Sequence, residues 1–390
     1  MQPSGIRAFF DLVLGMEDVI SLGVGEPDFV TAWQIREAGI YSLEQGFTSY
    51  TSNKGLYKLR MNLSRHLKSR YGLDYSPDDE ILITVGVSEG LDLALRSIIN
   101  PGDKIIIPQP SYVSYGPVTE LAGGIPVYIN TKEYGFKLTP GRLEKSIDKK
   151  TKAVVFNYPV NPTGISYTRK ELSELSKVML KHKIVCISDE IYSGLTYDFR
   201  HIPFAGLPGA RDNTIYLDGF SKSYAMTGWR IGFACGPQDV IAAMTKIHQY
   251  TIMCVPITSQ MAACEALHIG KRVVEEMKRE YKRRREYLLE GLGSLGFVCP
   301  KPQGAFYLFA CIDNTGLKDM EFARRLLKEQ KVAVVPGCAF GKEFDNYVRI
   351  SYTSSFDNLK EALHRIGVFL KTYPPKLAKN LGSELAKKSI

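Results

Sequence analysis

The sequence predicts an α/β fold in which a mostly parallel central sheet, covered by helices, forms a large domain and a smaller α+β domain follows. Two observations indicate it: short continuous apolar runs, and stretches of helical spacing between several of them. The length of 390 residues exceeds the usual size of one hydrophobic core, which favours at least two domains.

Six apolar runs are expected to form the central sheet. Each is short and continuous, as is typical of strands that are buried on both faces. The first is followed by residues 91–99, which have helical spacing. The six runs span residues 81–85, 104–107, 153–157, 184–188, 214–217 and 231–235.

The character of the sequence changes after about residue 286. A helix, a short strand pair around 305–310, a second helix and strands near Val332 and Val348 are expected there. We therefore divide the chain into four parts: an N-terminal arm that shares in the small domain, the large domain, the small C-terminal domain and a flexible basic tail. These parts span residues 1–45, 46–285, 286–375 and 376–390.

The formal net charge of +9 raises the question of a nucleic-acid or membrane partner. Much of the excess lies within residues 278–285, where apolar residues recur at helical spacing and predict a helix with a solvated basic face. These apolar residues are Val274, Met277, Tyr281 and Leu288. We expect anionic small ligands, and neither nucleic acid nor membrane as a partner.

The seven cysteines form no Cys-x-x-Cys pair and lie mostly in apolar surroundings. They are expected to be buried free thiols, and neither a disulfide framework nor a metal site. No signal peptide is expected at the start of the sequence, because Asp11, Glu17 and Asp18 interrupt its apolar stretch. These features predict a cytoplasmic protein.

The first predicted strand ends in Gly86-Val87-Ser88-Glu89-Gly90. Free backbone N–H groups at the start of the following helix would form a cradle for an anion such as a phosphate. The same residues match Gly-x-Ser-x-Gly, the nucleophile turn of serine hydrolases, with Ser88 as the nucleophile. Such a hydrolase also needs a downstream histidine, for which His248, His268 and His364 are available.

Three other strand ends carry unusual residues. An Asn-Pro-x-Gly turn lies within residues 157–164, and Asp189 directly follows an apolar run. Lys222 follows the run at 214–217, and Arg230 comes eight residues later. Alone, these features have ordinary explanations as a tight turn, a helix cap or a surface lysine. In open α/β sheets, however, ligands bind at the carboxyl ends of the strands, so these residues are expected to converge.

Taken together, the ordered motifs resemble the class I and II aminotransferases of fold type I, the family related to aspartate aminotransferase. The resemblance extends from Ser21-Leu22-Gly23-Val24-Gly25-Glu26-Pro27-Asp28 to Tyr347-Val348-Arg349-Ile350-Ser351. It implies an enzyme that uses pyridoxal 5'-phosphate (PLP) and transfers an amino group from an L-amino acid to a 2-oxo acid, with 2-oxoglutarate as the expected acceptor. Two ping-pong half-reactions are implied, with PLP held as an aldimine of Lys222.

The resemblance implies a role for each matching residue. Lys222 matches the Schiff-base lysine, which also moves the proton at the α-carbon of the substrate. Asp189 matches the acid that keeps the pyridine nitrogen protonated. Tyr192 and Asn161 match the groups that hydrogen-bond the phenolic oxygen, and Tyr112 matches the ring that stacks on the pyridine.

The phosphate contacts are implied in the same way. The backbone N–H groups of Val87 and Ser88 match the phosphate cup of the family. Ser221 belongs to the same cup, and Arg230 supplies it with a bidentate charged contact.

The substrate contacts and the subunit arrangement also follow from the resemblance. Arg349 matches the arginine that binds the substrate α-carboxylate through two parallel hydrogen bonds, beside Asn161 and Gly25. Tyr50 matches the tyrosine that reaches the phosphate of the neighbouring subunit. A homodimer with shared active sites is therefore expected.

The resemblance leaves the amino donor open. Some aspartate-using relatives have a lysine where this chain has Ser88, and this difference weakens an aspartate-specific interpretation. Alanine, aromatic, aspartate and diaminopimelate-type donors all remain open. Arg7 could bind a distal carboxylate or be a solvated arginine. The alternative to transamination is a β-lyase or racemase on the same fold, and the intact Lys222 and Asp189 disfavour a non-catalytic regulator.

Overall fold

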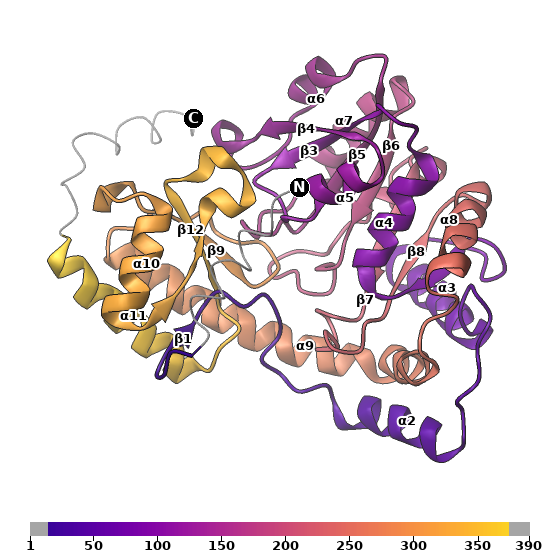
Figure 1. Ribbon diagram of the computed structural model, residues 1–390, viewed down its shortest axis with the longest axis horizontal. Helices are drawn as coiled ribbons and strands as arrows, with labels where there is room; N and C mark the ends of the chain where they lie inside the picture. Colours follow the sequence, from indigo (N-terminus) through magenta and orange to yellow (C-terminus); the bar gives the residue numbers. More distant parts are fainter. Residues whose placement is uncertain (1–14, 374–390) are drawn as a thin grey trace.

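The computed structural model describes residues 15–373 and confirms the predicted fold class. Its seven-stranded central sheet has the order β2-β8-β7-β6-β5-β3-β4 and is parallel except for β8, which runs antiparallel to β2 and β7 (Figure 1). Arg7 and the expected basic tail at 376–390 lie outside the described residues. The strands are β2 (Ile81–Thr84), β3 (Lys104–Gln109), β4 (Ile125–Asn130), β5 (Thr151–Asn157), β6 (Val185–Asp189), β7 (Thr214–Gly219) and β8 (Gly232–Cys235).

All six predicted strands are present, but β4 was not predicted. It lies at the edge of the sheet, where it pairs with β3 alone. Its Ile125 and Tyr128 are exposed, and only Ile129 is fully buried. A search for continuous, doubly buried runs misses such a strand because one side of it faces solvent.

Helices cover both faces of the central sheet, because successive residues of a strand point to opposite sides. Ile105 and Ile107 of β3 pack in one cluster with α4, α5 and α8, whereas Ile106 packs with α6 and α7. On the second face α3 also packs against β2 and α9. These helices are α3 (Tyr57–Tyr71), α4 (Gly86–Ile98), α5 (Tyr115–Leu121), α6 (Pro140–Ser146), α7 (Arg169–Lys181) and α8 (Gln238–Thr251).

A smaller sheet lies at the far end of the long helix α9 (Ile257–Ser294) (Figure 1). It is antiparallel in the order β11-β12-β9 and packs with α10, α11 and the last turns of α9. The expected domain boundary at 285–286 falls inside α9, which continues through it. The remaining elements are β1 (Ile20–Ser21), α2 (Trp33–Glu44), β9 (Tyr307–Cys311), α10 (Asp319–Gln330), β10 (Val332–Ala333), β11 (Val335–Pro336), β12 (Tyr347–Ser351) and α11 (Phe356–Thr372).

Helix α9 is amphipathic as predicted, but its basic face is narrower than expected. Arg284 and Arg285 are buried rather than solvated. The Arg284 guanidinium donates to both oxygens of Asp28 at 2.9 Å, and Arg285 pairs with Asp198 at 2.9 Å. The prediction of a solvated face failed at these two positions because the acids come from segments far away in sequence.

Strand β8 packs tightly against the turn that begins α4. A Cβ added at Gly232 would lie 2.8 Å from the carbonyl carbon of Gly86 and 2.8 Å from the nitrogen of Val87. Both neighbours are backbone atoms, so neither can rotate away. Gly86 itself has a φ of +71°, in the left-handed region that favours glycine. The two glycines together fix the start of α4.

We predict that Gly232→Ala destabilises the cofactor-free protein by about 1–3 kcal/mol, because the added methyl group displaces the Gly86-Val87 backbone. Urea unfolding measures this loss. Gly228→Ala is the control, since a Cβ at Gly228 meets no atom within 4 Å. If the two variants unfold at the same urea concentration, the packing of β8 does not constrain this turn.

Candidate active site

A cavity of about 890 Å³ lies where the carboxyl ends of β5, β6 and β7 meet the start of α4 and the small sheet. It brings together eleven of the twelve residues that the sequence analysis singled out, and Tyr50 is the exception. The eleven are Gly25, Val87, Ser88, Tyr112, Asn161, Asp189, Tyr192, Ser221, Lys222, Arg230 and Arg349.

Lys222 lies three residues beyond the end of β7. Its Nζ donates a hydrogen bond to the carbonyl of Gly25 at 2.7 Å. Burial lowers the pKa of Lys222 to about 8; nearby Glu26 opposes this effect, and Arg349 adds to it. Near pH 8 the Lys222 amine is therefore uncharged in about half of the molecules, and the uncharged amine can attack a carbonyl carbon.

Asp189 is the last residue of β6 and lies opposite Asn157 of β5. The hydroxyl of Tyr115 donates to Asp189 Oδ2 at 2.7 Å, and the N–H of Ile191 donates to Oδ1 at 3.2 Å. Burial outweighs these bonds and raises the pKa of Asp189 to about 6. A protonated ring nitrogen beside the carboxylate would lower this pKa, so Asp189 suits a cationic ligand atom.

The start of α4 forms an anion cradle. Gly86 opens the helix, and the N–H groups of Val87 and Ser88 lie in its first turn, where helical backbone donors have no partner within the helix. Arg230 lies beside this turn, because a Cβ at Gly86 would come within 2.8 Å of its Nη2. Ser221 lines the same cavity. This set of donors fits a phosphate.

Arg349 on β12 is buried and lines the same cavity. Its Nη1 donates to Asn161 Oδ1 at 2.9 Å, and its Nη2 donates to the Gly23 carbonyl at 2.7 Å. Burial lowers its pKa, and its Nε has no hydrogen-bond partner among the described residues. A buried, partly unpartnered guanidinium fits a carboxylate, which would accept two parallel hydrogen bonds.

Three residues of the cavity were missed by the sequence analysis as functional positions. Asn157 binds the backbone around the site: its Nδ2 donates to the Asp189 carbonyl, and its Oδ1 accepts from the Asn161 N–H. Tyr115 bonds the Asp189 carboxylate, and the Tyr307 hydroxyl lies 2.9 Å from that of Tyr192. Asn157 begins the Asn-Pro-x-Gly motif region and could have been found, whereas Tyr115 and Tyr307 lie in segments that resemble ordinary core.

Tyr50 lies outside the cavity and is 81% exposed. The segment around Tyr50 is joined to a second segment by the hydrogen bond from Asn53 Nδ2 to the Met253 carbonyl. Both segments carry exposed large hydrophobic side chains: Phe47, Tyr50 and Tyr57 in the first, and Tyr250, Ile252 and Met253 in the second.

The geometry does not support Ser88 as a hydrolase nucleophile. No histidine is among the described residues that line the cavity around Ser88. The ring of His248 lies 2.6 Å from Glu89 in a separate buried pair, and His268 is 81% exposed at its side chain. Nucleophilic serine catalysis needs a base within hydrogen-bond reach, which these positions do not provide.

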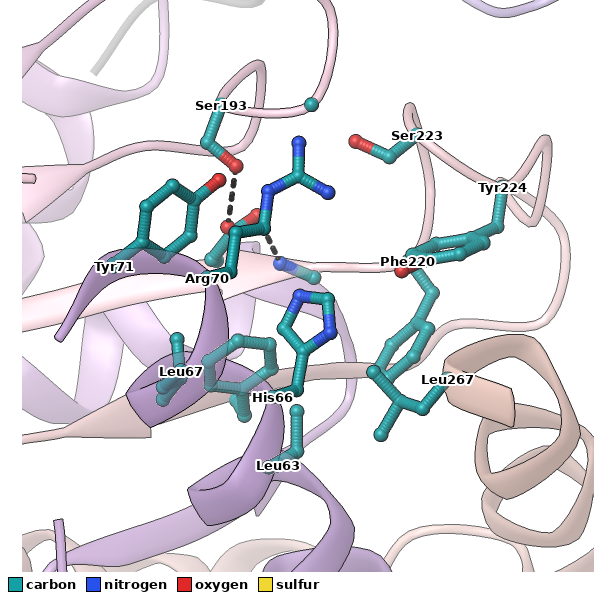
Figure 2. A pocket seen from close by; sticks show the side chains of 14 residues that line it. Leu63, His66, Leu67, Arg70, Tyr71, Ser193, Phe220, Ser223, Tyr224 and Leu267 are labelled. Atoms are coloured by element: carbon teal, nitrogen blue, oxygen red, sulfur yellow. Dashed lines mark hydrogen bonds between the residues drawn. The ribbon is translucent and has the colours of Figure 1, made fainter. Parts of the chain in front are cut away.

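A second cavity lies behind the strand that leads to Lys222, and Figure 2 shows the Arg70 guanidinium between Ser193 and Ser223 in it. Its volume is about 20 Å³, which is room for about one water molecule. This space is too small for a substrate, so the larger cavity is the candidate active site.

Asp218 lines this second cavity and joins two parts of the active site from behind. It accepts hydrogen bonds from the Ser193 hydroxyl at 2.8 Å and from the Gly219 N–H at 2.7 Å. Burial raises the pKa of Asp218 to about 7. The bonds tie the turn that carries Tyr192 to the turn that carries Lys222.

Within residues 15–373, no helix combines the length and the apolar character needed to cross a membrane. The same residues contain no cluster of three or more histidine, cysteine, aspartate or glutamate side chains placed to hold a metal ion. All seven cysteines are free; Cys186, Cys235 and Cys264 are buried as expected, whereas the other four are only half-buried.

The chain is similar to known proteins over nearly all of its length. The family described as aminotransferase class I and II matches residues 17–366. The putative aminotransferase YugH of Bacillus subtilis is 51% identical, with 95% of this chain and 96% of that protein covered. An aspartate aminotransferase of Pyrococcus abyssi is 42% identical with the same coverage. The solved structure of an aromatic aminotransferase from Pyrococcus horikoshii matches with a TM-score of 0.89 at 41% identity, covering 94% of this chain and 99% of that one.

The cavity and these similarities agree. A helix N-terminus suited to a phosphate, a buried acid suited to a cationic ring nitrogen and an amine suited to an aldehyde are the groups that PLP requires. The chain belongs to the class I and II aminotransferases, the fold type I enzymes that use PLP.

Proposed function

We propose that this aminotransferase transfers the amino group of an L-amino acid to 2-oxoglutarate in two ping-pong half-reactions, with PLP bound covalently to Lys222. One observation carries the proposal: the Lys222 amine, whose pKa is lowered to about 8, opens into the same cavity as the Asp189 carboxylate and the Arg349 guanidinium. Together they present a nucleophile, an acid for the ring and a binding site for the α-carboxylate.

The cofactor-binding residues would have distinct tasks. PLP, when bound, supplies the ring that accepts electrons from the α-carbon. Asp189 would keep the ring nitrogen protonated, and Tyr192 and Asn161 would hydrogen-bond the phenolic oxygen. Tyr112, which is half-buried at the cavity, would stack on the ring. Val87, Ser88, Ser221 and Arg230 would bind the phosphate.

The same amine that binds PLP would move the proton in each half-reaction. With substrate bound, the free Nζ of Lys222 would lie within the cavity, where it could take the proton from the α-carbon as an uncharged base. Arg349 would hold the α-carboxylate beside Gly25 and Asn161, so that the α-hydrogen faces Lys222. Burial serves both tasks because it raises the uncharged fraction of the amine near neutral pH.

We also propose a homodimer with shared active sites. Tyr50, Tyr250 and Met253 expose large hydrophobic side chains, and a second copy of the chain would cover them. Tyr50 would then reach the phosphate bound by the neighbouring subunit.

We further propose the four-part division of the chain into residues 1–45, 46–285, 286–375 and 376–390. A cytoplasmic location is also proposed, which the seven free cysteines favour.

The test of the function is the visible spectrum of the PLP-loaded enzyme during incubation with single amino donors. We expect aspartate, alanine, aromatic or diaminopimelate-type donors that are substrates to convert the bound cofactor to its amine form, and 2-oxoglutarate to reverse the change. Borohydride reduction and peptide mapping should find the cofactor on Lys222.

Lys222→Ala is the control for both measurements, because it should bind PLP without a covalent bond and give no reduced adduct. Reversible conversion is specific to transamination, so release of pyruvate and ammonia or racemisation of the donor without it would indicate a lyase or racemase. A reduced adduct on another side chain would overturn the assignment of Lys222.

We predict opposite effects of Asp189→Asn with and without PLP. In cofactor-free protein the pKa of Asp189 is raised from 3.8 to about 6, so its stabilising contribution is complete below about pH 4 and is lost as the pH rises through 6. The asparagine side chain of the variant cannot ionise, so its unfolding temperature should rise relative to wild type between pH 4 and pH 7. With PLP bound the carboxylate gains a cationic partner, so at pH 7 to 8 the variant should be stabilised less by PLP than wild type.

Asp218→Asn is the matched control for this prediction. It is also a buried acid with a raised pKa, about 7, but it does not line the active-site cavity. Because its side chain lies outside the cavity, Asp218→Asn should show a comparable pH effect in cofactor-free protein and lose less of the stabilisation by PLP than Asp189→Asn. Equal stabilisation of wild type and Asp189→Asn by PLP would show that Asp189 does not contact the cofactor.

We predict that Tyr50→Phe weakens PLP binding about tenfold, because it removes a hydrogen bond to a charged phosphate. Mixed dimers with Lys222→Ala locate the effect. If Tyr50 serves the neighbouring subunit, refolding a mixture of the two variants creates dimers with one intact site, and activity at limiting PLP rises above that of either variant alone. Activity equal to the average of the two parents would place Tyr50 outside the shared site.

A further inference from the structure

Tyr307, the first residue of β9, is a buried side chain that meets the active site from the small sheet. Its hydroxyl lies 2.9 Å from the hydroxyl of Tyr192. Its ring lies against Arg349, with 4.4 Å between the guanidinium carbon and the ring centroid. One side chain of the small sheet thus contacts both the tyrosine expected at the cofactor and the arginine expected at the substrate.

Tyr307 also explains why residue 25 is glycine. A Cβ added at Gly25 would lie 2.6 Å from the Tyr307 hydroxyl oxygen, whereas the next ring atom would be 3.6 Å away. The Tyr307 hydroxyl therefore occupies the space that a side chain at position 25 would need. The backbone of Gly25 is held close to the cavity, where its carbonyl accepts the hydrogen bond from Lys222.

A bound cofactor would fix the direction of the hydrogen bond between the two tyrosines. Without a ligand, either hydroxyl can be the donor. If Tyr192 donates its only proton to the phenolic oxygen of PLP, the hydrogen bond between the tyrosines persists only with Tyr307 as the donor. A donor behind Tyr192 polarises its hydroxyl and strengthens its bond to the cofactor.

We propose that Tyr307 is a positioning residue that orients Tyr192 toward the phenolic oxygen of the cofactor while it holds Gly25 and Arg349 at the substrate side. The inference rests on the proposed function, since it needs PLP bound at Lys222. Tyr307 acts through Tyr192, Gly25 and Arg349.

The first test is Tyr307→Phe, which keeps the ring against Arg349 and removes only the hydroxyl. The pH midpoint of the visible absorbance change of Lys222-bound PLP should rise by about half to one pH unit, because a weaker bond from Tyr192 stabilises the phenolate of the cofactor less. The kcat should fall while the KM of the donor stays close to wild type, because the ring at position 307 still contacts Arg349, which would bind the substrate α-carboxylate.

Tyr352→Phe is the matched control for the hydroxyl. Tyr352 is fully buried, and its hydroxyl lies 3.2 Å from that of Tyr197, a pair of the same kind outside the cavity. Removing the Tyr352 hydroxyl should leave the pH midpoint of the absorbance change unchanged. If Tyr307→Phe also leaves this midpoint unchanged, or shifts it only as much as Tyr352→Phe does, then Tyr307 does not orient Tyr192.

The second test needs no cofactor. Gly25→Ala should lower the unfolding temperature of PLP-free protein, because its methyl group meets the Tyr307 hydroxyl. In a Tyr307→Phe background the nearest ring atom is 3.6 Å from the new Cβ, an ordinary contact, so the same substitution should cost about half as much or less. If Gly25→Ala lowers the unfolding temperature equally in both backgrounds, then the Tyr307 hydroxyl does not constrain position 25.

The outcomes separate this inference from the function on which it rests. If wild type forms no borohydride-reducible bond at Lys222, the proposed function fails, whatever Tyr307 does. If wild type forms that bond and Tyr307→Phe has the wild-type midpoint, the function stands and the inference fails.

Discussion

The parallel pairing of β5, β6 and β7 is the constraint on which the site depends. It places Asn157 directly opposite Asp189 and ends β7 at the same edge, three residues before Lys222. Side chains 65 residues apart in the sequence thereby meet within one cavity. A shift of one residue in this register would turn Asp189 away from the cavity, because alternate residues of a strand face opposite sides of the sheet.

Burial then sets the chemistry of the groups that the sheet brings together. It raises the pKa of Asp189 and lowers the pKa of Lys222 and of Arg349, so the charged form of each group is disfavoured in the protein alone. A ligand with a cationic ring nitrogen, an aldehyde and a carboxylate-bearing partner would relieve each of these costs. The site is thus organised in advance for its ligands, and the energy for this arrangement comes from the folding of the whole domain.

Much of this could be predicted from the sequence, and the failures have physical reasons. Lys222 follows one recognisable buried strand and Asp189 ends another, so local patterns place both at the correct edge of the sheet. The local sequence around Arg284 predicts a solvated face, but in the structure its guanidinium binds Asp28. This contact joins distant segments, so no local pattern predicts it. Tyr307 resembles an ordinary core residue of a short strand, because its importance comes from three neighbours that lie far away in sequence.

The choice of donor must be made in a different part of the cavity from the chemistry. Relatives at 41–42% identity are named for aspartate in one case and for aromatic amino acids in another. In the proposed mechanism Lys222 and Arg349 would act on atoms that all α-amino acids share, and Asp189 would act on the cofactor ring, so none of the three can distinguish these donors. The remaining wall includes Val113, Pro117 and Val118, on α5 or just before it, none of which contacts Asp189 or Lys222 through a hydrogen bond. We therefore expect substitutions in this wall to change the donor while the register of β5–β7, and with it the reaction, stays the same.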